Sequence, residues 1–567
     1  MLQAIPHRQK ITVLIAVMSG LFLAALDQTI IGTALGRIVE EFNSFESLSW
    51  IVTAYLVTST ITVPISGKLS DMYGRRNLLL AGVAVFTLAS FLGGIAGNVE
   101  ALIAARALQG VGGGILFSSA FSIIGDLFTP KERGKWQGVF GAVFGLSSVV
   151  GPLLGGFLTD NHVVFGLTTD WRWTFLINVP IGLAVFALIA VTCPNFKHET
   201  KHKIDFLGAG LLTIALTALI FACENADNIF GSFLDATGLT GTALRVIFGV
   251  IAAIFTVLFL MAERRAASPI LPLHLFRLPV FSLTMPIVLL FGAAFMGAII
   301  YLTQYLQQVL GASATDSGLM LMPMIFALAG TSAITGRLMS SGVRYKPLLI
   351  GGIVLLLFGM ISFATLTADS TFFDVAWRMV LAGIGIGASM PTFNLIVQNE
   401  AQQKDIGVAT SSVQLSRSLG STVGTALLGG LLTAGVAASL GDINRDAFVT
   451  SLKQNPQAAS MLGAGGTVTA DTALQLNSPD VQKKIEAGIR SGIEQSALPA
   501  AAKPAAIDKA LQQQKDFSHK VREAFAASLQ KVFVWAAVLV ALALALSFFL
   551  KEIPLRDRGT TEVAPGH

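Results

Sequence analysis

Runs of about twenty apolar residues recur along almost the whole chain, and no other feature limits its fold as strongly. A helix needs about 20 mostly apolar residues to cross the hydrocarbon core of a bilayer, and it satisfies its own backbone hydrogen bonds there. We count about fourteen such runs. They lie near 11–36, 48–69, 77–97, 100–126, 136–159, 172–193, 204–223, 242–261, 280–305, 317–340, 346–368, 374–398, 407–436 and 528–551. The sequence therefore predicts an all-α polytopic membrane protein.

The charge content agrees with this prediction. Only 13% of the 567 residues are charged and 53% are hydrophobic, whereas a soluble domain carries roughly a quarter of charged residues. Polar surface is thus too scarce to cover a water-soluble globule, and the lipid bilayer must cover part of the chain. The net charge of +5 is interpreted as basic cytoplasmic loops rather than as a nucleic-acid partner.

Basic and acidic residues alternate between successive loops. The basic loops hold Arg8, Lys10, Lys68, Arg75, Arg76, Lys131, Arg133, Lys135, Lys197, Lys201, Lys203, Arg264, Arg265, Arg337, Arg344, Lys346, Lys551, Arg556 and Arg558. The other loops hold Glu40, Glu41, Glu46, Asp160, Asp170, Asp227, Asp235, Asp316 and Asp369. Because basic loops stay in the cytoplasm, we expect a multi-pass protein of the cell (plasma or inner) membrane with both termini cytoplasmic. That arrangement requires an even number of spans.

Three landmarks occur twice, in the same order. The glycine after the second run, Gly67, matches Gly336, Arg106 matches Arg378, and Gly151 matches Gly424. Their separations are 336 − 67 = 269, 378 − 106 = 272 and 424 − 151 = 273. We therefore expect two homologous six-helix bundles with two inserted spans, a pattern typical of transporters that rock one half against the other.

This repeat sets the expected domain boundaries. The predicted parts are an N-terminal six-helix bundle (1–200), two inserted spans (201–265), a C-terminal bundle of spans 9–13 (266–436), a partly helical extracytoplasmic loop (437–527), and the last span with a cytoplasmic tail (528–567). The loop has helical runs near 479–497 and 505–527, the second continuing into the last span. Two interpretations of the loop stay open: a cap over the cavity, or a binding surface for a partner of unknown identity.

Several motifs resemble those of one family. The loop from Gly67 to Arg76, with Asp71, Gly74 and Arg75, is similar to the signature loop of the major facilitator superfamily. The resemblance extends to its fourteen-span drug:proton antiporter branch, of multidrug efflux type. It implies the major facilitator fold, a conformational role for the loop, no enzyme activity, and no cofactor beyond a proton gradient.

Further motifs support the same resemblance. In the fifth run, Gly151, Pro152, Gly155 and Gly156 resemble the antiporter motif of the family, which is thought to seal the carrier against leak. Proline removes a backbone donor and glycine permits close packing, so ordinary helix packing also accounts for this set. The resemblance covers the chain except for roughly residues 440–527.

Asp27 is an acid near the middle of the first run, flanked by apolar residues. Such a group costs roughly 2.5–3.5 kcal/mol at helix centre and needs compensation. Arg106 of the fourth run lies at a similar depth when residues are counted inward at about 1.5 Å each. We predict that the two form a pair in which proton binding to Asp27 releases Arg106. The alternatives are a purely structural acid, and an arginine that contacts only backbone carbonyls.

Polar and aromatic residues inside the runs are candidates for a substrate cavity, because such side chains avoid lipid. They are Gln28, Asn178, Tyr301, Gln304, Tyr305, Gln308, Asn394, Gln398 and Gln414. Arg417 is a further cation inside a run, and no role is assigned to it. The histidines show no metal-binding spacing and there is no nucleotide-binding loop, so we expect no metal and no catalytic residues.

The sequence thus favours proton-coupled export of lipophilic, cationic drugs or related amphiphiles by a monomer. Export of a specific endogenous metabolite or lipid, and nutrient symport, are alternatives of the same class. A membrane receptor or scaffold would need neither the repeat nor Asp27, and a membrane enzyme would need a nucleophile or metal cluster.

Overall fold

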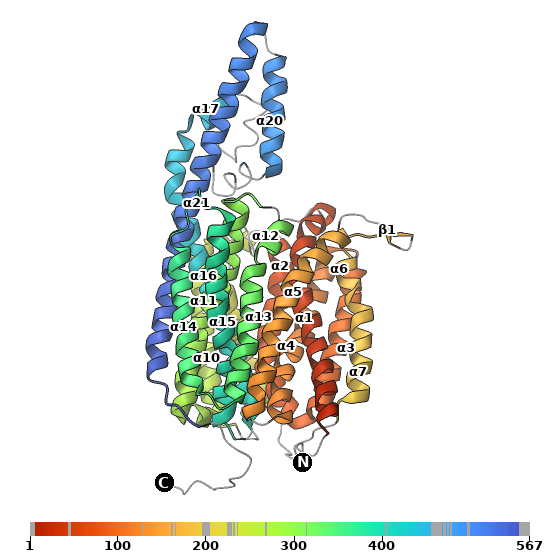
Figure 1. The fold of residues 1–567 in the computed structure, drawn as a ribbon. Coiled ribbons are helices and arrows are strands. Elements are labelled where there is room, and N and C mark those ends of the chain that lie inside the picture. The colour runs from red at the N-terminus through yellow and green to blue at the C-terminus, as the bar shows by residue number, and fades with distance from the viewer. Residues whose placement is uncertain are drawn as a thin grey trace.

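The computed structural model describes residues 6–42, 47–128, 130–159, 163–164, 166–194, 205–223, 230, 233–234, 236–266, 269–312, 314–402, 405–454, 468, 472, 476, 479–495 and 499–554. Long helices lie side by side in one bundle (Figure 1). Two helices and the start of a third project from it. We call the end of the bundle where α1 begins and α21 ends the terminal end, and the opposite end the far end.

The first half of the bundle uses the N-terminal residues. Its helices are α1 (His7–Phe42), α2 (Ser47–Tyr73), α3 (Arg75–Gly94), α4 (Val99–Leu127), α5 (Pro130–Thr159), α6 (Trp173–Leu176) and α7 (Asn178–Thr192). A short antiparallel hairpin of β1 (Val163–Val164) and β2 (Leu167–Thr168) lies between α5 and α6. The sequence predicted neither this hairpin nor the break that divides the sixth span into α6 and α7.

Two helices separate the halves in the sequence: α8 (Phe206–Cys223) and α10 (Gly241–Glu263). The second half contains η2 (Leu273–Arg277), α11 (Pro279–Gln308), α12 (Ala314–Met320), α13 (Met322–Ser340), α14 (Tyr345–Phe363), α15 (Phe372–Glu400), α16 (Ile406–Asn444), α17 (Ala447–Gln454), α20 (Pro479–Glu494), η4 (Ala500–Ala502) and α21 (Lys503–Phe548). As predicted, the helical run after residue 505 continues without interruption into the last span.

The described residues contain 12 helices long and apolar enough to cross a membrane. The two remaining predicted spans correspond to α5 and to α12 with α13. These helices pack against each other where the halves meet, so that a Cβ added to Gly145 would lie 2.6 Å from the side chain of Ile325. Their contact with the opposite half explains why α13 is less apolar than helices that face lipid. All fourteen predicted spans are therefore helical.

The internal repeat is present in space as well as in sequence. A Cβ added to Gly112 of α4 would lie 2.6 Å from the backbone nitrogen of Phe86 on α3. A Cβ added to Gly385 of α15 would lie 2.4 Å from the backbone nitrogen of Leu356 on α14. The two glycines are 385 − 112 = 273 positions apart. Each half thus packs its fourth helix onto its third at the same glycine, which confirms two homologous bundles.

The same spacing corrects one predicted match. Gly114 contacts α2 and Gly387 contacts α13, again 387 − 114 = 273 positions apart. The counterpart of Arg106 is then the buried Met379, not Arg378. Arg378 lies near the far end of α15, where it donates a hydrogen bond to the carbonyl oxygen one turn earlier. The second half has no buried ion pair at this position.

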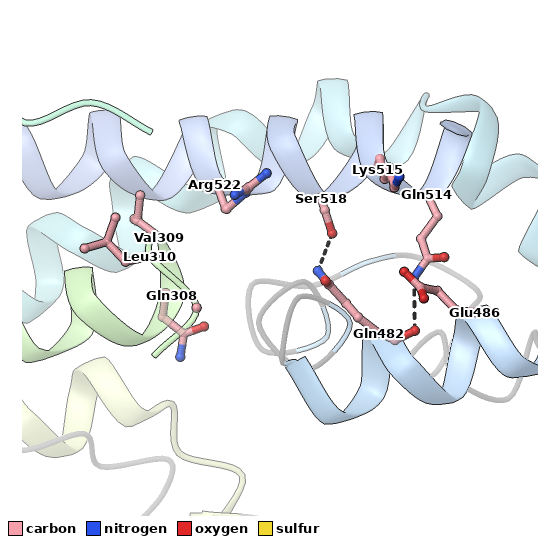
Figure 2. A pocket seen from close by; sticks show the side chains of 10 residues that line it. Gln308, Val309, Leu310, Gln482, Glu486, Gln514, Lys515, Ser518 and Arg522 are labelled. Atoms are coloured by element: carbon pink, nitrogen blue, oxygen red, sulfur yellow. Dashed lines mark hydrogen bonds between the residues drawn. The ribbon is translucent and has the colours of Figure 1, made fainter. Parts of the chain in front are cut away.

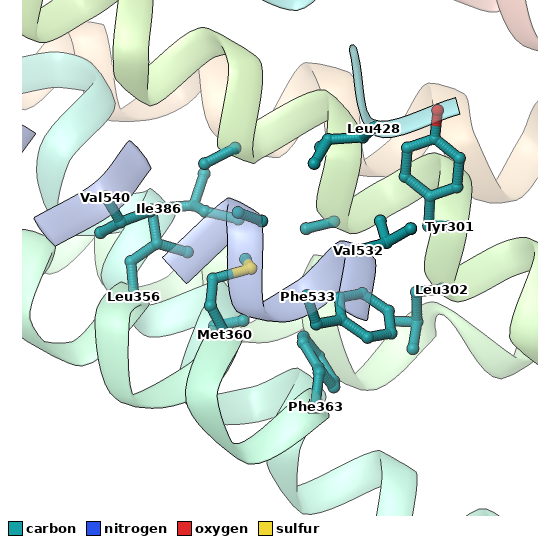
Figure 3. Packing of buried hydrophobic residues seen from close by; sticks show 14 of the residues in the cluster. Tyr301, Leu302, Leu356, Met360, Phe363, Ile386, Leu428, Val532, Phe533 and Val540 are labelled. Atoms are coloured by element: carbon teal, nitrogen blue, oxygen red, sulfur yellow. The ribbon is translucent and has the colours of Figure 1, made fainter. Parts of the chain in front are cut away.

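Apolar side chains from α11, α14, α15, α16 and α21 fill the core of the second half (Figure 3). Leu302 of α11, Met360 and Phe363 of α14, and Phe533 and Val540 of α21 are at most 1% exposed. One face of the membrane part of α21 thus packs into this half. Beyond the far end, α17 and α20 pack against the first part of α21 (Figure 1). The projecting helices are therefore joined to the second half through α21.

Candidate functional site

Asp27 lies inside the first half, and only 1% of it is exposed. Its Oδ2 accepts a 2.7 Å hydrogen bond from Nη1 of Arg106 on α4. Its Oδ1 accepts hydrogen bonds from Nε2 of Gln109 (2.7 Å) and from Nδ2 of Asn178 at the start of α7 (2.9 Å). All three partners donate, which suits an ionised carboxylate. The break between α6 and α7 brings the Asn178 amide to this acid.

Arg106 is buried, and it contacts polar groups and an aromatic ring besides Asp27. It is 1% exposed, and it donates to Oε1 of Gln109 (2.7 Å) and to the carbonyl oxygen of Ile51 on α2 (3.3 Å). Its guanidinium lies 4.4 Å from the ring centroid of Tyr55, within the range of a cation–π contact. The structure therefore places the predicted partners Asp27 and Arg106 in direct contact. An arginine side chain is effectively always protonated in proteins.

The signature loop begins α3. Gly74 has a φ of 91°, in the left-handed region that favours glycine, and α3 starts at the next residue. Arg75 is 1% exposed, and it donates from Nε to Oδ2 of Asp126 on α4 and from Nη1 to Oγ of Ser70, both at 2.6 Å. Arg75 is therefore a buried link between three helices and not a solvated loop residue.

Arg76 and Asp71 are the other two charged residues of the loop motif. Arg76 donates from Nη2 to the carbonyl oxygen of Ala190 near the end of α7, at 2.5 Å. The side chain of Asp71 lies outside the described part of the structure. Arg76 thus joins α3 to α7, and the role of Asp71 stays a prediction.

The glycine motif of α5 packs against α1 close to Asp27. A Cβ added to Gly151 would lie 2.0 Å from Oγ1 of Thr29, and one added to Gly155 would lie 2.9 Å from the carbonyl oxygen of Ile30. Pro152 instead faces the other half, 3.2 Å from a Cβ added to Gly318 of α12. The carbonyl oxygen of the fourth member, Gly156, accepts a hydrogen bond from Thr159. This motif therefore connects the helix of the buried acid to the second half.

An ion pair ties the far end of α1 to the segment before α6. Nη2 of Arg172 lies 2.7 Å from Oε1 of Glu41, and Nε1 of Trp171 donates to Oε2 of the same acid at 2.6 Å. The hydrogen bond from Arg172 holds the pKa of Glu41 below its ordinary value. Both charged side chains are partly exposed, so the pair contributes little to stability. It orients α1 at the far end.

The two halves contact each other closely at the terminal end. A Cβ added to Gly67 of α2 would lie 2.4 Å from Oγ of Ser411 on α16. Gln398 of α15 donates to the carbonyl oxygen of Phe121 on α4 at 3.4 Å, and Arg133 of α5 donates to the carbonyl oxygen of Gln398 at 3.5 Å. These contacts close the terminal end between the halves.

Gly67→Ala should open this closed end. The added methyl would lie 2.4 Å and 2.8 Å from Oγ and Cβ of Ser411, and overpacking of this kind costs about 1–3 kcal/mol. Spin labels on Tyr73→Cys and Ser341→Cys, both exposed and one on each half, should move apart in this variant. The distance is measured with and without Gly67→Ala in a protein from which the two native cysteines, Cys193 and Cys223, have been removed.

The matched control for this prediction is the double variant Gly67→Ala with Ser411→Gly, which removes the clashing side chain. The distance between the labels should shorten again toward that of the parent. An unchanged distance in Gly67→Ala alone would show that the contact between α2 and α16 does not hold the terminal end closed.

Apart from Asn178, which contacts Asp27, the predicted cavity residues separate into two groups. Asn394 and Gln414 are 3% exposed, and the Asn394 Oδ1 and the Gln414 Nε2 have no hydrogen-bond partner among the described residues. Gln28 and Gln304 are partly exposed on α1 and α11. Gln398 also faces the opposite half, through its contact with α4. These five remain candidates for substrate contact.

The second group of predicted cavity residues consists of Tyr301, Tyr305 and Gln308. The two tyrosines lie inside the second half, and Gln308 lies at the far end of the bundle. Tyr301 donates to the carbonyl oxygen of Thr425, and Tyr305 donates to that of Thr367 in the loop after α14. Both rings belong to the apolar core of the second half. Gln308 ends α11 and lines a pocket at the far end. The sequence does not give the direction in which a helix face points, and the assignment of these three to the cavity stays a prediction.

The pocket at Gln308 lies between α11, α20 and α21 (Figure 2). Gln482, Glu486, Lys515 and Arg522 also line it. Its volume of about 160 Å³ is below the roughly 300–1,000 Å³ of pockets for drug-sized ligands. In this structure the pocket is therefore smaller than a drug-sized ligand requires.

Sequence reasoning missed three residues of the buried networks. Gln109 was assigned no role, although it follows Arg106 by three positions and so shares its helix face. Asp126, the partner of Arg75, was not singled out, and Arg133 was counted only among the basic loop residues. A search for every acid inside an apolar run would have found Asp126, since such acids need partners.

Comparison with known proteins agrees with this geometry. Residues 17–425 match the Major Facilitator Superfamily. The chain is 32% identical over 543 residues to Multidrug transporter protein MdtP of Bacillus subtilis (strain 168), covering 95% of this chain and 92% of that protein. It is also 32% identical over 539 residues to Multidrug resistance protein 3 of the same strain, covering 95% and 94%.

A solved structure shares the fold. The human organic anion transporter MFSD10 (TETRAN) superposes with a TM-score of 0.57 at 17% identity, covering 75% of this chain and 94% of that one. At this identity the similarity concerns the fold alone. The match over most of the chain, the two repeated bundles and the signature loop together identify the protein as a membrane transporter that belongs to the Major Facilitator Superfamily.

Proposed function

We propose that this chain is a proton-coupled secondary transporter that exports lipophilic amphiphiles by alternating access. The observation that carries the proposal is the buried pair of Asp27 and Arg106, at 2.7 Å. A carboxylate that can titrate is held there by a cation that cannot. Relatives named as multidrug transporters support export of lipophilic compounds as the kind of transport.

The pair can act as a switch between two states. When Asp27 is ionised, it neutralises Arg106 and holds α1, α4 and α7 together through its three hydrogen bonds. A proton on Asp27 removes the charge that compensates Arg106 and weakens this junction. Because the α5 motif packs onto α1 at Thr29 and Ile30, a shift of α1 is passed directly to a helix that contacts the second half.

Loop charges support a cytoplasmic terminal end, since most loops there are basic. On this assignment the contacts of Gly67, Gln398 and Arg133 close the cavity to the cytoplasm, and the projecting helices lie outside the cell. The proposed cycle therefore alternates between this state and one in which the terminal end is open.

A labelling experiment tests the orientation. In a protein without Cys193 and Cys223, Tyr73→Cys at the terminal end and Ser491→Cys on α20 both place an exposed thiol. An impermeant maleimide added to intact cells should label Ser491→Cys, and it should label Tyr73→Cys only after lysis. Labelling of both from the same side would contradict the proposed topology and an even number of spans.

The export itself is tested with everted membrane vesicles and a lipophilic dye. An imposed gradient, acidic inside, should drive accumulation of the dye, and an ionophore that collapses the gradient should stop it. Accumulation that continues after collapse, or that needs ATP, would contradict proton coupling.

A further inference from the structure

We propose that Arg417 of α16 binds an anionic group of the exported compound, so that the substrates are amphiphilic organic anions such as lipophilic carboxylates and sulfonates. This inference rests on the proposed export function and specifies its substrate class. It replaces the expectation of cationic substrates that the sequence suggested.

Arg417 lies in the middle of the bundle at the junction between the halves. Its guanidinium is 6.0 Å from the ring centroid of Phe121 on α4, in the opposite half. The next residue, Ser418, forms a 2.9 Å hydrogen bond with Thr60 of α2. The side chain of Arg417 is therefore directed between the two halves, where a major facilitator protein holds its substrate.

The charge of Arg417 is not compensated within the described part of the chain. Arg106 and Arg75 each have a carboxylate at 2.7 Å or less, in Asp27 and Asp126. Arg417 has no hydrogen bond and no carboxylate oxygen within 4.0 Å among the described residues. It is partly exposed. Since a charge at membrane depth is costly and usually paired or functional, an uncompensated guanidinium here indicates an anion that arrives from outside the protein.

Other polar groups without a partner among the described residues lie on α16 itself and on two helices that contact it, α4 and α15. The Oγ atoms of Ser118 and Ser119 on α4, Oδ1 of Asn394 on α15 and Nε2 of Gln414 on α16 are buried without partners among the described residues. Three of these residues lie one helical turn from a residue that contacts the opposite half. Ser118 precedes Phe121, Asn394 precedes Gln398, and Gln414 precedes Ser418. Serine hydroxyls and a side-chain amide are donors that an anion can use, and charge-assisted hydrogen bonds of this kind are the strong ones.

An aromatic pair of the first half lies next to Arg417. The rings of Phe121 and Phe140 are stacked, with centroids 3.9 Å apart and planes 8° from parallel. Both rings belong to the apolar core of the first half, and Phe121 gives the guanidinium an apolar neighbour. A lipophilic cation would be repelled by Arg417, and no described carboxylate oxygen lies within 4.0 Å of this arginine.

Three fluorescent probes with one skeleton test the inference: 1-pyrenebutyrate, 1-pyrenebutanol and 1-pyrenebutylamine. Binding to the full-length protein in nanodiscs is measured by fluorescence anisotropy, with the signal of empty nanodiscs subtracted. The wild type should bind the butyrate at least about tenfold more tightly than the amine, because one charge-assisted hydrogen bond corresponds to about 10- to 100-fold in affinity.

Variants locate the effect. Arg417→Gln should weaken binding of the butyrate by about 10- to 100-fold and change binding of the butanol little, and Arg417→Lys should keep part of the preference. Arg378→Gln is the matched control, since this arginine lies near the far end with contacts to its own helix, and it should bind the butyrate like the wild type.

Equal binding of the three probes by the wild type, tighter binding of the amine, or unchanged butyrate binding in Arg417→Gln would overturn the inference. The wild-type comparison needs no variant, so a folding defect in Arg417→Gln leaves the test intact. No gradient is used in these measurements. A failure of proton coupling therefore leaves the binding result unaffected, and a transporter that pumps cations but not anions would refute only the anion site.

Discussion

Asp27→Asn should abolish proton-driven export while the protein still reaches the membrane. The amide cannot take up or release a proton, so the junction between α1, α4 and α7 would no longer respond to pH. The side chain keeps nearly the same size, and the hydrogen bonds that surround it can be partly remade. The measurement is dye accumulation in everted vesicles under an imposed gradient, normalised to the amount of transporter in the membrane.

The structure also shows how a proton on Asp27 could be accommodated. Oδ1 of Asn178 is buried without a partner among the described residues, while its Nδ2 donates to Asp27. A half-turn of this amide would present an acceptor to the protonated carboxyl. Asp27→Glu should therefore retain partial export, since it can still titrate. Gradient-driven accumulation at the wild-type level in Asp27→Asn would place the coupling proton elsewhere.

Arg106→Ala should damage the protein more severely than Asp27→Asn. Removing one partner of a buried ion pair costs roughly 3–5 kcal/mol, because the remaining charge is left without compensation. The variant also loses the contacts with Gln109, Ile51 and the Tyr55 ring. We expect low expression and a large drop in thermal stability, measured by fluorescence size-exclusion chromatography of heated membranes in detergent.

A double variant provides the control. Asp27→Asn added to Arg106→Ala removes the uncompensated carboxylate and should recover much of the expression, but no proton-driven export. Arg106→Lys should also be defective, since a lysine cannot reproduce the planar set of donors that reaches three acceptors. A double variant no better expressed than Arg106→Ala would show that the two residues are not energetic partners.

The helices and their number could be predicted from the sequence because membrane spans are set by length and apolarity. The pair of Asp27 and Arg106 could be predicted for a similar reason, since two charges at similar depth in the membrane must be compensated. The match of Arg106 with Arg378 failed by one position. An offset taken from side-chain identity is less certain than one taken from the glycines at which helices touch.

The lateral direction of a side chain could not be predicted. Gln308 and Tyr305 are polar residues in an apolar run, as Gln414 is, but they face the far-end pocket and the core of their own half. Long-range partners were missed for the same reason: Arg75 and Asp126 are 51 positions apart and meet only because α3 packs on α4. Arg417 had no role in the sequence interpretation, and its significance came from the lack of a described partner.

Substrate-driven proton movement tests the central claim most directly. Purified transporter is reconstituted into liposomes with a trapped pH-sensitive dye and no initial pH gradient, and a lipophilic substrate that the vesicle assay has identified is added outside. If export is coupled to protons through Asp27, substrate entry should drive protons out, and the trapped dye should report an alkaline shift that is absent with Asp27→Asn. Substrate movement without any pH change in the wild type, or an equal change in Asp27→Asn, would contradict the account.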